Sequence, residues 1–154
     1  MYSNQKLAID LLISVFATFI LSTTVLSVST ANWYIQANQS RFGLFQQCTI
    51  PCCCQTRELG RTITMLSLFS LVLLLTSTLA SFLLMGTRIN EKNHCYVLVP
   101  VALFGAGVAM TMAFVRVHDI TYVNGYSALI FLIDTVLAYT LGGISILHGS
   151  MFYF

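Results

Sequence analysis

Four long apolar stretches dominate the pattern of hydrophobic and polar positions along this chain. They cover residues 7–28, 63–86, 96–115 and 127–147. Each is about 20 residues long or slightly longer, which lets a helix rising about 1.5 Å per residue cross a hydrocarbon core of about 30 Å. The pattern therefore predicts an all-α membrane protein with four transmembrane helices, folded as a single domain over residues 1–154.

Small and hydroxyl side chains recur at helical spacing in three of these stretches. They are Ala102, Gly105, Ala106, Ala109 and Ala113 in the third stretch, Ser67, Ser70, Ser77 and Ser81 in the second, and Ser14, Thr18 and Ser22 in the first. The small residues let helix backbones approach closely where lipid gives no hydrophobic drive to pack, and the hydroxyls can bond back to their own helix or across to a neighbour. We expect them to pack a left-handed bundle. The alternative, a polar pathway for ions or solutes, would need charged partners that these faces lack.

The segments between the stretches differ greatly in length. Loop one covers residues 29–62, loop two is a short turn over 87–95, and loop three covers 116–126. The seven Lys and Arg residues divide three to four between the two sides, so the positive-inside rule does not orient the chain. A glycosylation sequon at Asn38 favours an extracellular loop one, with cytoplasmic termini and a plasma-membrane location.

Loop one has the composition of a small β-structure. Residues 31–36 are rich in aromatic and β-branched side chains, residues 38–40 are turn-like, and residues 41–48 supply a returning strand. A β-hairpin over the bundle is therefore expected, because its backbone groups pair with each other near a membrane surface. Taken alone, Trp33 just beyond the first stretch is typical of an interfacial anchor.

Four of the five cysteines also lie in loop one. In an oxidising compartment Cys48 is expected to bridge to one of Cys52, Cys53 and Cys54, which would contribute roughly 2–3 kcal/mol through the unfolded chain's entropy. With the opposite topology, the same three cysteines would instead be candidates for palmitoylation. Cys95, at the expected cytoplasmic end of the third stretch, is a separate acylation candidate.

Charged side chains are scarce, at 8% of residues against 57% hydrophobic ones. The net charge of +2 gives no reason to expect a nucleic-acid partner. No metal-ligand spacing, nucleophile elbow or phosphate-binding glycine loop is visible, so we expect no enzyme activity, cofactor or metal site.

Two acids nevertheless fall within apolar stretches. Asp134 lies inside the fourth, where a charge is costly and a functional role is the default suspicion. We expect it to be protonated or to bond to a hydroxyl such as Ser67 or Thr18, with partner binding or ion sensing as the alternative. Asp10 lies near the end of the first stretch and is expected to reach headgroup water. His148 has no neighbour in the sequence that suggests chemistry.

The loop-one motif resembles that of the claudin superfamily, which includes the peripheral myelin protein, epithelial membrane proteins, lens intrinsic membrane protein and calcium-channel gamma subunits. Trp33 matches the family tryptophan, Gly43-Leu44-Phe45 matches its Gly-Leu-Trp with Phe for the second Trp, and Cys48 matches the first cysteine. Arg61 stands where the family often has an arginine opening the second span. Loop one is shorter than in classical claudins, and the second cysteine follows sooner.

The resemblance implies a protein that acts by binding rather than by catalysis. Its extracellular loops would contact other membrane proteins or a second copy of this chain, for cell adhesion, a cell junction or the organisation of a membrane complex. The hairpin would offer Tyr34, Phe42, Leu44 and Phe45 as apolar contacts. The alternative is an auxiliary subunit of a channel or receptor, bound through the small-residue stripe of the third span. A pore or transporter has weaker support.

Overall fold

The computed structural model describes residues 2–36, 40–48, 54–56, 60–86, 95–120 and 122–152. Its four helices are α1 (Tyr2–Ser29), α2 (Arg61–Met85), α3 (Cys95–Ile120) and α4 (Tyr126–Phe152). Each is long and apolar enough to cross a membrane. The expected four-span membrane protein is thereby confirmed.

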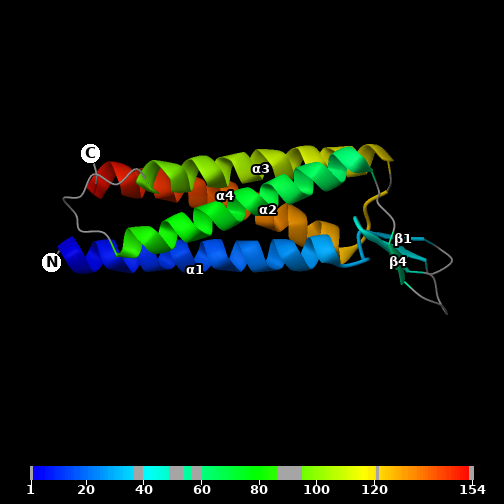
Figure 1. Cartoon of the computed structure of the whole chain (residues 1–154), viewed down its shortest axis with the longest axis horizontal. Coiled ribbons are helices and arrows are strands. Elements are labelled where there is room, and N and C mark those ends of the chain that lie inside the picture. Colours follow the sequence, from blue (N-terminus) through cyan, green and yellow to red (C-terminus); the bar gives the residue numbers. More distant parts are fainter. Residues whose placement is uncertain are drawn as a thin grey trace.

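The helices lie side by side along the long axis of the molecule (Figure 1). α1 packs against α2 and α4, and α3 packs against the same two helices, so the four form a closed ring of neighbours. The N- and C-terminal helix ends lie together at one end of the bundle, and the strands lie at the other (Figure 1). We call these the terminus end and the sheet end.

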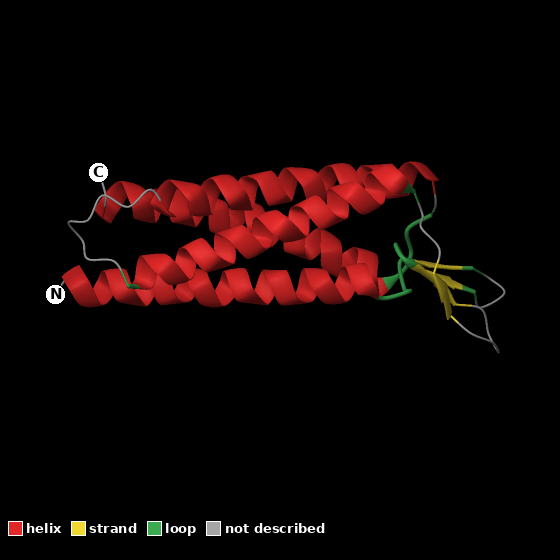
Figure 2. Cartoon of the chain, viewed as in Figure 1, coloured by secondary structure: helices red, strands yellow, loops and turns green. Residues whose placement is uncertain are grey.

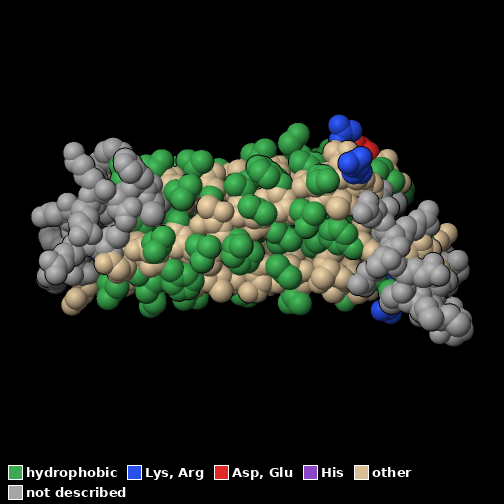
Figure 3. All heavy atoms as spheres, in the orientation of Figure 1, with side chains coloured by type: hydrophobic (Ala, Val, Ile, Leu, Met, Phe, Trp, Pro, Cys, Tyr) green, Lys and Arg blue, Asp and Glu red, His purple; other side chains and the backbone are tan. Residues whose placement is uncertain are grey.

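The helices bury hydroxyl side chains in addition to an apolar core and expose large apolar side chains outward. α2 buries Ser67, Ser70, Ser77 and Ser81 in the interior, while it exposes large side chains such as Leu79 and Leu83. In the face that Figure 3 displays, hydrophobic side chains cover the long middle of the bundle, and the visible Lys, Arg and acidic side chains gather toward the sheet end. Lipid solvates exposed Leu as well as an interior would, so close contact between small and hydroxyl side chains can determine what lies inside.

The first-span hydroxyls follow this rule only in part. Ser14 is fully buried, but Thr18 and Ser22 are exposed and donate back to their own helix, to the carbonyls of Ser14 and Thr18. Of the two uses expected for these hydroxyls, all three bond back to their own helix, and only Ser14 lies in the packed interior. An i→i−4 bond satisfies a hydroxyl in lipid without any neighbouring helix.

Loop three is shorter than the expected 116–126. α3 continues to Ile120 and carries Arg116, His118 and Asp119 as exposed side chains on its last turns. A helix satisfies its own backbone hydrogen bonds, so it can continue past the first charged residue and out of the apolar layer. The connection to α4 is consequently a tight turn that includes Asn124 and Gly125.

The described part of loop one forms a small antiparallel sheet of four strands (Figure 2). The strands are β1 (Tyr34–Ile35), β2 (Arg41–Phe42), β3 (Gln46–Cys48) and β4 (Cys54–Thr56), paired in chain order. The β-structure is as expected, but the single returning strand over 41–48 is wrong. Instead β2 and β3 pair with each other, with Arg41 opposite Cys48 and Phe42 opposite Gln47.

The strand is interrupted because the turn between β2 and β3 is inserted into the bundle. A Cβ on Gly43 would lie 2.7 Å from Cα of Ala31 and also collide with the Thr30 carbonyl, so only glycine permits this approach. The next residue, Leu44, is completely buried in the core that the helices share. An uninterrupted strand could not bring Leu44 into that core.

Candidate functional site

Trp33 fixes the sheet to the helices at the sheet end. Its ring is 1% exposed and packs on Phe131 of α4, with centroids 5.0 Å apart. The indole Nε1 donates to the Ser27 carbonyl of α1 at 2.8 Å, and the backbone N–H donates to the Phe42 carbonyl of β2 at 2.9 Å. The interpretation of Trp33 as an interfacial anchor is therefore wrong, because a buried side chain cannot anchor at a lipid headgroup.

The turn before α4 extends this connection to β1. The Ile35 N–H donates to Asn124 Oδ1 at 2.8 Å, and Asn124 Nδ2 donates to the Ile35 carbonyl at 3.0 Å. The Gly125 N–H donates to the Trp33 carbonyl at 3.0 Å. Asn124 thus satisfies backbone groups on the free edge of β1. Sequence reasoning missed this residue, although the Asn-Gly pair at 124–125 is a recognisable turn signal.

The surface that results differs from the predicted one. Leu44 is buried, and Phe45 is half-buried against the core, so neither is the outward contact that was expected. Tyr34 and Phe42 are half-buried and stack on each other with centroids 5.6 Å apart. The outward side chains around the turn belong to other residues, which we call the sheet-end patch: Ile35, Tyr122, Asn124 and Tyr126. Tyr122 is 84% exposed.

Several predicted residues can be located only in part. Cys48 is disulfide-bonded. Of its predicted partners, Cys52 and Cys53 lie outside the described residues, and Cys54 faces Cys48 in the β3–β4 register with a side chain that is not described. The pairing therefore stays a prediction.

Three further residues belong with these. Asn38 lies outside the described residues. Cys95 opens α3, and its side chain is not described either. Arg61 is the exposed first residue of α2.

Asp134 is 1% exposed between α4 and α1. Thr23 Oγ1 donates to its Oδ1 at 2.8 Å, and Thr24 Oγ1 donates to its Oδ2 at 3.0 Å. A hydroxyl partner was expected, but Ser67 and Thr18 were the wrong candidates. A threonine hydroxyl of α1 thus lies within hydrogen-bonding distance of each oxygen of the carboxyl group, and the arrangement ties α1 to α4.

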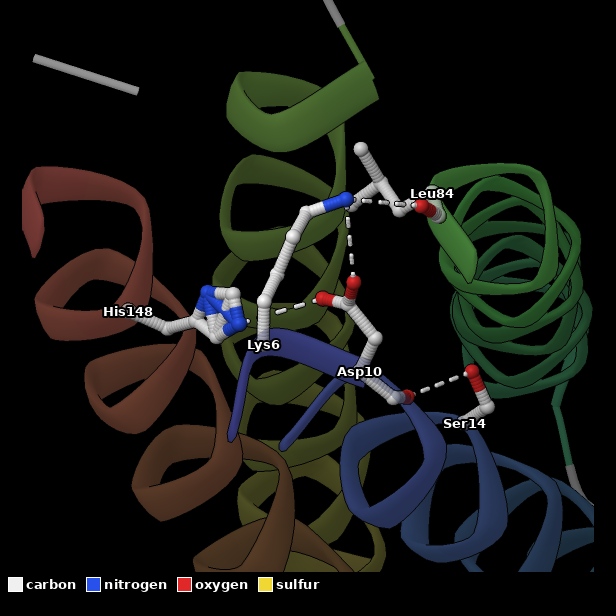
Figure 4. Close-up of polar contacts among 5 residues, drawn as sticks. All are labelled: Lys6, Asp10, Ser14, Leu84 and His148. Atoms are coloured by element: carbon white, nitrogen blue, oxygen red, sulfur yellow. Dashed lines mark hydrogen bonds and ion pairs between the residues drawn. The ribbon is translucent and has the colours of Figure 1, made fainter. Parts of the chain in front are cut away.

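A second buried acid lies at the terminus end, where Figure 4 shows three helices converging. Asp10 of α1 is 3% exposed, with its Oδ2 3.4 Å from Lys6 Nζ and its Oδ1 3.1 Å from His148 Nε2 of α4. Lys6 Nζ also donates to the Leu84 carbonyl of α2 at 3.4 Å. The expectation that Asp10 reaches headgroup water is therefore wrong, and His148 is not isolated. Lys6 and Asp10 are visible as an i,i+4 pair, but no sequence signal points to His148.

Two hollows adjoin this cluster. A cavity of about 10 Å³ is lined by Asp10, Ile13, Ser81, Leu84, Tyr96, Ser145, His148 and Gly149. A much larger groove, about 480 Å³, opens between α3 and α4 and is lined by Tyr96, Val97, Pro100, Val101, Phe104, Ser145, Ile146 and Gly149. The two share Tyr96, Ser145 and Gly149, so a single wall of side chains separates a polar cavity from an apolar groove.

The small-residue stripe of α3 faces inward. Ala102, Ala106 and Ala109 are each at most 3% exposed, and Gly105 is half-buried with its Cβ position 3.1 Å from Leu73 of α2. The proposed use of this stripe to bind a channel or receptor is thus wrong, because the chain's own helices already cover it.

No group of three or more His, Cys, Asp or Glu residues that could hold a metal ion occurs within the described ranges. Comparison of the chain with protein-family models and with curated proteins gives no match.

Proposed function

We propose that this chain is a claudin-like integral membrane protein that acts by protein–protein interaction through its sheet end. The observation that carries the proposal is that exposed aromatic side chains lie on a rigidly held frame. Tyr122 and Tyr126 are 84% and 55% exposed. They flank the Asn124 side chain that holds β1 through two hydrogen bonds. A preorganised patch of this kind loses little conformational entropy on binding, and tyrosine is enriched in binding surfaces.

Three of the motif residues, Trp33, Gly43 and Leu44, support the claudin-like part of the proposal because they build this frame. Trp33 and Leu44 fill the sheet end of the helix core, and Gly43 permits the close approach of the β2–β3 turn to α1. In this proposal the sheet end is extracellular, the termini are cytoplasmic, and the membrane is the plasma membrane.

The partner is another membrane protein, or a second copy of this chain, that presents an apolar or aromatic surface near the membrane. The four residues of the sheet-end patch are uncharged, and the exposed Arg41 lies beside them as the register partner of Ile35, so the contact is apolar at its centre with hydrogen bonds from the tyrosine hydroxyls. Aromatic residues at this height also occur in lipid-facing interfacial belts. The experiment must therefore distinguish a protein neighbour from a lipid neighbour.

A photoreactive amino acid introduced at Tyr122 in living cells makes this distinction. We expect irradiation to give a covalent adduct of discrete higher mass that contains a second protein. The matched control carries the same amino acid at Val136, which is 56% exposed in the membrane-spanning part of α4 and should label lipid alone. If position 122 also yields lipid adducts alone, the patch is an interfacial belt and the interaction proposal fails.

The topology is tested separately. An extracellular sheet end predicts that an Asn38→Gln change abolishes a glycosidase-sensitive shift in gel mobility. Acyl groups found on Cys52, Cys53 or Cys54, without such a shift, would invert the topology. Each outcome leaves the result at position 122 interpretable, because a protein adduct can form on either side of the membrane.

A further inference from the structure

The groove between α3 and α4 at the terminus end is shaped for an apolar ligand. Its volume of about 480 Å³ falls within the range of about 300–1,000 Å³ typical of small-molecule sites. The outer rim of the groove is formed by Val97, Val101 and Ile146, whose side chains are 46%, 61% and 51% exposed. Because these residues lie in segments that can cross a membrane, the groove opens directly to lipid.

One part of the groove wall is polar and leads to the buried acid. Ser145, which is 5% exposed, and Tyr96 line both the groove and the cavity that contains Asp10 and His148. Gly149 completes the shared wall, and a Cβ there would be 3.6 Å from the Tyr96 ring. The apolar groove is therefore separated from the polar cavity only by Tyr96, Ser145 and Gly149, and the glycine contributes no side chain to this wall.

The carboxylate in that cavity has unused capacity to accept a hydrogen bond. Asp10 Oδ2 is buried and accepts no hydrogen bond of good geometry within the part of the chain that the structure describes. Lys6 Nζ lies 3.4 Å from it, longer than the approximately 2.8 Å of a charge-assisted bond. Asp10 also lines the cavity, so a neutral donor that reached the cavity could give this carboxylate a further hydrogen bond.

The size and charge of the cavity limit what that donor can be. A volume of about 10 Å³ is close to the minimum for one water-sized group, so a hydroxyl fits and a phosphate headgroup does not. The negative charge of Asp10 already has Lys6 as an ion-pair partner, so the site offers no net charge to a charged head. A neutral head with one hydroxyl matches both limits.

We propose that this groove and cavity bind a lipid with a slender apolar body and a single hydroxyl head. The body lies between Val101 of α3 and Ile146 of α4, and the hydroxyl passes Ser145 to donate to Asp10. No covalent bond is made or broken. The site lies at the end opposite the sheet-end patch, so the proposal is independent of the function proposed above.

Photolabelling with a matched pair of probes tests the proposal. The full chain is placed in phosphatidylcholine nanodiscs with hexadecan-1-ol that carries a diazirine in its chain, or with the methyl ether of the same probe. The ether retains the apolar body but cannot donate a hydrogen bond. We expect the alcohol to label peptides of α3 and α4 at the groove at least fivefold more than the ether does.

Two pairs of variants locate the site. Val101→Trp fills the groove and should abolish the preference for the alcohol. Val115→Trp makes the same change at a similarly exposed valine of α3 outside the groove, and should leave the preference intact. Asp10→Asn should reduce the preference at least threefold while the ether still labels the groove, which shows that the bundle remains folded.

Two results would overturn the proposal. Equal labelling by alcohol and ether in the unaltered protein would mean that the groove holds acyl chains without recognising a hydroxyl, and that water occupies the cavity. An alcohol preference that survives Val101→Trp would place the label at another site.

Discussion

The contact between α1 and α4 contains a buried aspartate at each of its two ends, and the two aspartates differ in their hydrogen-bond and ion-pair partners. Toward the sheet end, a threonine hydroxyl of α1 lies within hydrogen-bonding distance of each oxygen of Asp134. At the terminus end, Asp10 lies between Lys6 and His148, and its Oδ2 accepts no well-formed hydrogen bond from the described residues. A cavity adjoins Asp10. A buried carboxyl group whose oxygens all have hydrogen-bond donors is typical of a contact that only stabilises the fold. A buried carboxyl group with an oxygen that lacks a donor, beside a cavity, can still accept a hydrogen bond from a ligand.

The contrast extends to the packing around each acid. Toward the sheet end, Trp33 and Phe131 are almost fully buried, and the turn before α4 is hydrogen-bonded to β1. At the terminus end, the interhelical groove of about 480 Å³ remains open. The molecule thus joins a closely packed end that presents a rigid patch to an opposite end that retains empty volume. Changes to the buried contacts of the sheet end should mainly affect stability, and changes at the terminus end should also affect ligand binding.

The largest effect is expected from Trp33→Ala. It removes a buried aromatic ring and the indole bond to the Ser27 carbonyl, so the free energy of unfolding should fall by about 4–5 kcal/mol. Titration with SDS in mixed micelles measures this change. Trp33→Phe is the control, because it retains a ring against Phe131 and should lose about half as much. If Trp33→Ala costs less than the phenylalanine variant, the sheet does not depend on this contact.

The fold was predictable from sequence where it depends on length and local composition. The four spans follow from runs of apolar residues as long as a bilayer is thick, and the strands of loop one follow from β-branched and aromatic residues. The division of 41–48 into β2 and β3 could not be found in this way. It depends on the close approach of Gly43 to the Ala31 backbone, which exists only after the sheet has docked on α1.

The polar contacts show the same limit. Asp134 was recognisable as unusual from sequence because the free-energy cost of placing a carboxylate in lipid depends only on its position within the span. Its partners Thr23 and Thr24 depend on the rotation of α1 about its axis. The hydroxyl pattern of Ser14, Thr18 and Ser22 indicated a different face, because large apolar residues on the lipid side leave the inward face undefined. Asp10 and His148 lie at opposite ends of the sequence, and only the closure of the helix ring brings them together.

The next largest effect concerns the charges at the terminus end. Asp10→Leu leaves Lys6 buried without its carboxylate, so the free energy of unfolding should fall by about 3 kcal/mol. Adding Lys6→Leu removes the buried cation as well and should restore more than half of that loss. The same SDS titration measures both variants. An unimproved double variant would mean that packing around Asp10, and not its ion pair, holds α1 against α4 at this end.

The smallest effect should come from Thr24→Val at the other acid. The valine retains the shape of the threonine but leaves Asp134 Oδ2 without its donor, while Thr23 still donates to Oδ1. Hydrogen bonds between membrane helices average about 0.6 kcal/mol, so we expect a loss of about that size. Thr140→Val, at an exposed threonine of α4 that bonds only within its own helix among the contacts found, is the control and should change the free energy of unfolding less. A loss of 3 kcal/mol or more for Thr24→Val would mean that Asp134 is as sensitive as Asp10 to the loss of one partner. The two ends of the bundle would then not differ in how they accommodate a buried acid.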